Sequence, residues 1–110
     1  MITRIKDKAL SQAITYAINR KIEKFGSVAF LRIDTVEKRI EMSLELLGEN
    51  EPIQVSIQRY RFQESDGRFF LSAEGIETSR KWIDIAAREY LLSQRVEIPA
   101  RYAGLIRRFL

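Results

Sequence analysis

The spacing of the hydrophobic residues changes twice along this chain, and each change marks a different kind of element. Over residues 2–25 they recur every three or four positions, which is the spacing of one face of an α-helix. The positions are Ile2, Ile5, Ala9, Ala13, Ala17 (or Ile14 and Ile18 instead), Ile22 and Phe25. Gly26 and Ser27 follow and are typical of a helix end. The sequence therefore predicts a helix that ends before residue 26.

In the middle of the chain, hydrophobic and polar residues alternate. This alternation is typical of β-strands that bury one face. It predicts four strands, over residues 28–35, 38–47, 52–62 and 68–77. The stretch LGENEP joins the second strand to the third, and Asp66-Gly67 forms a two-residue turn between the third and the fourth. We therefore expect an antiparallel meander.

The two hairpins have expected registers. Leu46 is predicted to lie opposite Ile53, and the turn at Asp66-Gly67 pairs Phe62 with Leu71. This second pairing turns the aromatic residues of RYRFQESDGRFF toward one face and its arginines toward the other. A platform for single-stranded nucleic acid needs exposed rings and cations on the same surface. The stretch is therefore interpreted as core aromatics beside solvated arginines.

The third strand contains a conflict. Val55 and Ile57 have odd numbers, whereas Tyr60 and Phe62 have even numbers, so one regular strand cannot bury both pairs. We predict a β-bulge near Gln58-Arg59, where an extra residue would restore the alternation. The same alternation turns three hydrophobic residues outward, which are Val28, Phe30 and Phe70.

Helical spacing returns after the fourth strand. Thr78 or Ser79 is a suitable cap for a helix over SRKWIDIAAREYLLSQ, and Pro99 starts a short final helix, PARYAGLIRRFL. The predicted fold is one α+β domain with the order α-β-β-β-β-α-α. It is a two-layer sandwich in which the helices pack on one face of a four-stranded antiparallel meander.

The order of a long helix, a curved meander and another helix resembles, in architecture, half of a tubular lipid-binding domain. That resemblance implies an apolar tunnel between helix and sheet. The candidate residues for such a ligand pocket are Tyr60, Trp82 and Tyr90. An aromatic stripe at helical spacing is also typical of an ordinary core, and this second interpretation is the one we favour.

Composition excludes several kinds of chemistry. The chain has no cysteine and no histidine, so it lacks a thiol nucleophile, the usual general base and the commonest metal ligands. It contains no glycine-rich phosphate-binding motif and no nucleophile elbow. We therefore expect a protein that is not an enzyme and has no cofactor and no metal.

The positive charge is unevenly distributed along the chain. The formal net charge is +4. Residues 1–25 and 79–110 are basic, whereas residues 26–78 carry six basic and ten acidic side chains. A basic end can meet an anionic membrane or a nucleic acid. Nucleic-acid binding through the lysines and arginines of the first helix is the less favoured of these possibilities.

The leading hypothesis is an interaction domain that self-associates or joins a larger assembly. Its candidate partner surface consists of Phe30, Phe70, Tyr102, Arg107, Arg108 and Phe109. The alternatives are a hydrophobic ligand, or an anionic membrane bound through residues 99–110. The N-terminal stretch contains no long apolar run, so the expected location is the cytoplasm, with peripheral attachment to a membrane as the alternative.

Overall fold

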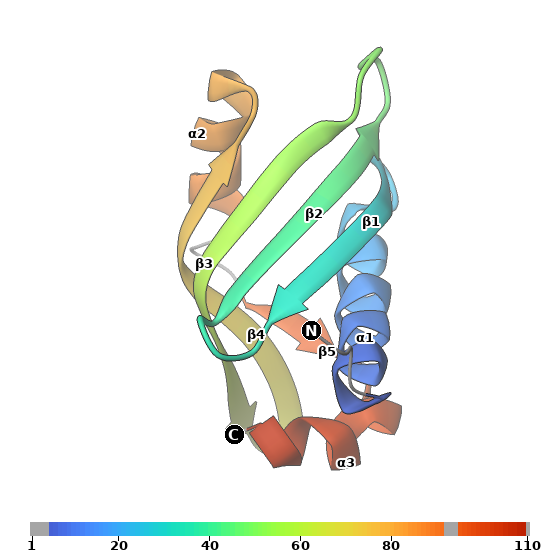
Figure 1. The fold of residues 1–110 in the computed structure, drawn as a ribbon, viewed down its shortest axis with the longest axis vertical. Coiled ribbons are helices and arrows are strands. Elements are labelled where there is room, and N and C mark those ends of the chain that lie inside the picture. The colour runs from blue at the N-terminus through green and yellow to red at the C-terminus, as the bar shows by residue number, and fades with distance from the viewer. Residues whose placement is uncertain (1–4, 92–94, 110) are drawn as a thin grey trace.

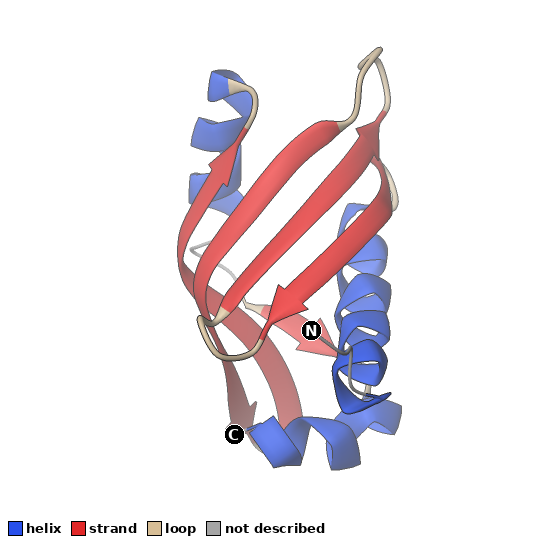
Figure 2. Cartoon of the chain, viewed as in Figure 1, coloured by secondary structure: helices blue, strands red, loops and turns tan. Residues whose placement is uncertain are grey.

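The protein folds as a curled antiparallel sheet with helices, and the computed structural model describes residues 5–91 and 95–109 (Figures 1 and 2). The elements are α1 (Ile5–Ile22), β1 (Gly26–Asp34), β2 (Arg39–Leu46), β3 (Ile53–Ser65), β4 (Arg68–Thr78), α2 (Lys81–Leu91), β5 (Val96–Ile98), the 3-10 turn η1 (Ala100–Tyr102), α3 (Ala103–Ile106) and the 3-10 turn η2 (Arg107–Phe109). The α+β class and the antiparallel meander are confirmed.

In the described part of the chain the sheet has five strands in the order β1-β2-β3-β4-β5, so the predicted count of four is wrong. The missed strand, β5, is antiparallel to β4 and is only three residues long. Val96 and Ile98 are buried in it, whereas Glu97 is exposed. The single final helix predicted from residue 99 is also corrected, because that stretch is divided into η1, α3 and η2.

The curl of the sheet brings both of its edges to the same helix. α1 contacts β1, the first edge strand, and also β5, the last. In Figure 1, β5 points toward α1, which lies beside β1. The core is enclosed between α1 and the concave side of the sheet, so the predicted two-layer arrangement is curled and half-closed. The buried residues of α1 are Leu10, Ala13, Ile14, Ala17 and Ile18.

The alternation of inward and outward side chains is interrupted in β3 and β4 at neighbouring positions. In β3, Ile57 and Tyr60 are both buried, and Gln58 and Arg59 between them point away from the core. Arg59 adopts a left-handed backbone conformation with φ 53°. This is the place where the sequence predicted a bulge in β3.

The partner strand makes the same change, so the irregularity lies where the bulge was predicted but does not shift the register between β3 and β4. In β4, Ala73 and Ile76 both face the core, and the two residues between them are the exposed Glu74 and Gly75, which has no side chain. Gln58 pairs with Gly75 and Tyr60 pairs with Ala73, which is the same register on either side of Arg59. Because both strands carry an extra residue at this level, the hydrogen-bonded register is kept while the strands bend (Figure 1).

A bulge does occur in β1. The register with β2 shifts between Val28 and Phe30, at Ala29. This shift turns Val28 inward, where it packs against the core, so its predicted outward direction is wrong. Phe30 points outward as predicted and is 62% exposed.

One hairpin register was predicted correctly and the other was not. Phe62 pairs with Leu71, and the turn between them has φ 53° at Asp66 and φ 78° at Gly67, values that suit a tight hairpin. Ile53, however, pairs with Leu44 rather than with Leu46. A shift of two residues keeps the same side chains on the same face, which is why the predicted core of these strands is still correct.

Candidate interaction surface

The six residues of the predicted partner surface do not form one surface. Phe70 is half-buried by its own chain. The guanidinium of Arg95 lies 4.1 Å from the centre of its ring, and that of Arg68 lies 5.7 Å away. Phe30 lies in β1, at the opposite edge of the sheet from β5.

The C-terminal part of the predicted surface packs on the core. Tyr102 and Phe109 are half-buried and contact core residues, and Ile106 between them is fully buried. The guanidinium of Arg107 lies 5.4 Å from the ring of Phe69, a buried residue. Arg108 is exposed. The apolar side of residues 99–109 therefore packs inside the protein, as in an ordinary packed tail.

The predicted ligand pocket is not formed by its three residues. Tyr60 is only 3% exposed and makes an edge contact with Phe62, with 5.5 Å between ring centres. Trp82 is 61% exposed, so it lies on the surface rather than over a cavity. The side chain of Tyr90 is outside the described residues.

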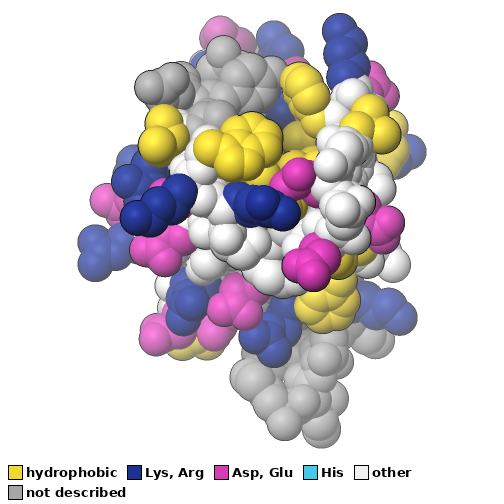
Figure 3. All heavy atoms as spheres, turned by 90° about the horizontal axis from the view of Figure 1, so that it is seen from above, with side chains coloured by type: hydrophobic (Ala, Val, Ile, Leu, Met, Phe, Trp, Pro, Cys, Tyr) yellow, Lys and Arg dark blue, Asp and Glu magenta, His cyan; other side chains and the backbone are white. Residues whose placement is uncertain are grey.

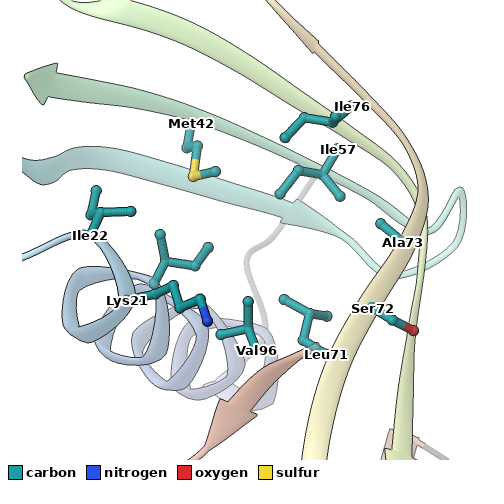
Figure 4. Close-up of a pocket in the computed structure, with 10 residues that line it drawn as sticks. Lys21, Ile22, Met42, Ile57, Leu71, Ser72, Ala73, Ile76 and Val96 are labelled. Carbon is teal, nitrogen blue, oxygen red and sulfur yellow. The ribbon is translucent and has the colours of Figure 1, made fainter. Parts of the chain in front are cut away.

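A different apolar cavity lies between α1 and the concave side of the sheet (Figure 4). Its volume is about 40 Å³. It is lined by Ile18, Lys21, Ile22, Met42, Ile57, Leu71, Ser72, Ala73, Ile76 and Val96. One water molecule needs roughly 10–15 Å³ of such volume, and an apolar cavity of about 150 Å³ holds benzene. The cavity is therefore too small for a lipid chain unless the surrounding residues move.

Among the described residues, four large hydrophobic side chains are exposed on α2 and on the segments that flank β1 and β2, which lie toward the upper end of the molecule in Figure 1. They are Phe25 at 59%, Leu47 at 80%, Trp82 at 61% and Ile85 at 62%. We call them the apolar end surface. Figure 3 looks onto this end and shows hydrophobic side chains beside both basic and acidic ones.

Three chain segments meet at the apolar end surface. The backbone N–H of Leu47 donates to the carbonyl oxygen of Phe25 at 2.8 Å, which joins the β2–β3 loop to the start of β1. In the same loop, Glu49 Oε1 lies 3.0 Å from Arg80 Nε, just before α2. The sequence separates these segments widely, so this surface could not be assembled from local patterns.

The start of α2 is held in place by its own polar side chains. Asp84 accepts a hydrogen bond from the backbone N–H of Thr78 at 3.0 Å and forms an ion pair with Arg88 at 3.2 Å. Among the described side chains of α2, Ile83 alone is buried. The prediction that Trp82 is part of the core is therefore wrong. The sequence does not show that α2 contacts β4 through so narrow a side that Trp82 stays outside the contact.

Within residues 5–91 and 95–109, no group of three or more histidine, cysteine, aspartate or glutamate side chains could hold a metal ion. No helix in the described part of the chain is long and apolar enough to cross a membrane. Comparison with protein-family models, curated proteins and solved structures finds no match to this chain.

Proposed function

We propose that this protein is a non-enzymatic interaction domain that binds another protein surface through the apolar end surface. The observation that carries the proposal is the joint exposure of Trp82 and Ile85 on one short helix, with Leu47 and Phe25 at the same end. Clustered exposed apolar residues are typical of protein contact sites. Tryptophan in particular is enriched among the residues that dominate binding energy.

Isolated exposed hydrophobic residues are common and need no partner, so the other outward residues provide a comparison. Val36 is 79% exposed in the β1–β2 turn, and Phe30 is 62% exposed on β1. Neither belongs to the apolar end surface. The outward ring of Phe70 is already covered by Arg95.

The test compares Trp82→Lys and Val36→Lys as immobilised baits in extracts of the source cells, with quantitative mass spectrometry of the bound proteins. We expect a partner that is retained by the unchanged protein and by V36K but is lost from W82K. A set of bound proteins that is identical for all three baits would contradict the proposal.

The apolar cavity supports a second, more limited candidate function, which is binding of a small apolar ligand. Its walls come from α1 and four strands, and Lys21 is the charged member of the lining. Native mass spectrometry of the purified protein tests this function directly. An added mass that organic extraction removes, and that is absent from the Ala73→Leu variant, would support ligand binding. A protein with no added mass before extraction would contradict it.

A further inference from the structure

The exposed side of α2 is centred on Ile85. Successive residues of an α-helix are rotated by about 100°, so Lys81, Ile85 and Arg88 lie opposite the buried Ile83. All three are exposed, and Trp82 lies on the flank of this side and is exposed as well. Ile85 is 62% exposed on this outward helix side, with Lys81 and Arg88 beside it.

The charges around the apolar end surface are nearly balanced. The segments 23–25, 47–51 and 77–88 contain four basic side chains, Lys24, Arg80, Lys81 and Arg88, and five acidic ones, Glu23, Glu49, Glu51, Glu77 and Asp84. An anionic membrane or a nucleic acid is attracted by an excess of positive charge, which this end lacks although the whole chain has a net charge of +4. Mixed charges of both signs are complementary to a second surface of the same kind.

The order of residues along α2 is also self-complementary. If two copies of α2 pack antiparallel with a two-fold axis at Ile85, each Trp82 lies opposite Arg88 of the other copy, because both are three residues from the axis. An arginine over an indole ring makes a favourable cation–π contact. The guanidinium of Arg88 is oriented by its ion pair with Asp84, at 3.2 Å, and by a hydrogen bond that its Nε donates to the carbonyl oxygen of Ile76 at 3.4 Å. Its side chain is still 55% exposed and can meet a second surface.

A helix of this length is too small to hold a dimer by itself. Stable interfaces bury about 800 Å² on each partner, which requires contacts beyond one helix side. Leu47 and Phe25 extend the apolar area away from α2 at the same end of the molecule.

From these features we infer that the partner of the apolar end surface is a second copy of this chain. The two copies form a two-fold dimer with antiparallel α2 helices and Trp82 against Arg88 of the other copy. This inference rests on the proposed function, because it uses the same surface and names its partner.

The test is the molecular mass over a range of protein concentrations, measured by sedimentation equilibrium. Trp82→Lys places a cation against Arg88 of the other copy, and we expect the dissociation constant to rise by roughly ten-fold or more. Combining Trp82→Lys with Arg88→Glu restores opposite charges across the interface and returns the constant toward its original value. Val36→Lys adds the same charge elsewhere and leaves it unchanged, and circular dichroism establishes that each variant is folded.

Two results overturn the dimer in different ways. A protein that is monomeric at every concentration contradicts the second copy as partner but leaves the proposed function with a different protein partner. A dimer that is insensitive to Trp82→Lys contradicts the second copy as the partner of this surface, because the contact between copies then lies elsewhere, and the bait comparison described above then decides the proposed function. Binding to phosphatidylserine vesicles that Trp82→Lys abolishes, with no dimer in solution, would also overturn the inference in favour of a membrane.

Discussion

The side-chain oxygen of Asn19 accepts a hydrogen bond from the backbone N–H of Val28, with 2.7 Å between the two atoms. Asn19 belongs to α1, and Val28 lies beside the bulge in β1. A bulge interrupts the regular hydrogen bonding of a strand, and here the helix supplies an acceptor for the edge strand. This bond therefore fixes α1 against the edge of the sheet.

Replacing Asn19 with leucine should destabilise the protein by about 1–2 kcal/mol, because the partly buried N–H of Val28 loses its acceptor. Asn19→Asp keeps an oxygen in the same position and should retain most of the stability. Urea denaturation of both variants measures the difference. Equal losses in the two variants would mean that the hydrogen bond is not the cause.

Gly26 is expected to tolerate no larger residue. A Cβ atom at this position would lie 2.0 Å from the carbonyl oxygen of Glu45, which belongs to the neighbouring backbone. Gly26→Ala should therefore cost at least about 2 kcal/mol of stability. Gly104→Ala is the matched control, since no atom lies within 4 Å of its added Cβ, and it should be neutral or slightly stabilising in α3. Thermal unfolding of both variants distinguishes them.

Filling the cavity between α1 and the sheet should stabilise the protein. Ala73→Val adds two methyl groups at the lining of the cavity and should raise the free energy of unfolding by about 0.5–1 kcal/mol. Leu71→Ala enlarges the same space at a buried position and should lower it by about 2–5 kcal/mol. Urea denaturation measures both changes, with the exposed Ala29→Val as the control. A loss of stability in Ala73→Val would show that the space is already filled.

The ion pair between Arg68 and Glu97 should contribute a pH-dependent part of the stability. Arg68 donates a hydrogen bond to Glu97 at 2.8 Å, and this bond lowers the pKa of Glu97 from its ordinary value of 4.5. The folded state therefore favours the charged carboxylate. Its contribution is complete above the ordinary pKa and is lost as the pH falls through the lowered pKa.

The variant Glu97→Gln measures this contribution. Both groups are exposed, so the difference in stability from the unchanged protein should be small. It should be constant near neutral pH and should shrink as the pH falls below the ordinary pKa of glutamate. Glu51→Gln, at an exposed loop position, should give no such trend, and a difference that grows in acid would contradict the assignment.

The sequence predicted the middle of the fold well because its signals are local there. Alternation in β2 and the turn at Asp66-Gly67 each depend on neighbouring residues, and both agree with the structure. An alternation over only three residues is too short to identify a strand, so β5 was missed. The sequence shows that the alternation of β3 breaks at Gln58-Arg59. It does not show how the structure accommodates the break, because the matching change lies in β4.

The candidate site was harder to predict than the fold. Trp82 and Ile83 are both hydrophobic and adjacent, and helical spacing alone does not say which of them faces the sheet. The exposure of Trp82 depends on where α2 sits against β4. Likewise, the alternation in β4 correctly predicts that Phe70 points outward, but no local pattern shows that Arg95 covers its ring.

The contact of α1 with β5 also has a consequence for how the chain acquires its structure during synthesis. The residues of α1 leave the ribosome well before β5, which begins at residue 96, and long-range contacts of this kind form slowly. Until that strand emerges, β4 presents an open edge, which is a template for pairing with other chains. Late closure of the sheet is therefore the step at which nascent chains of this protein are most exposed to aggregation.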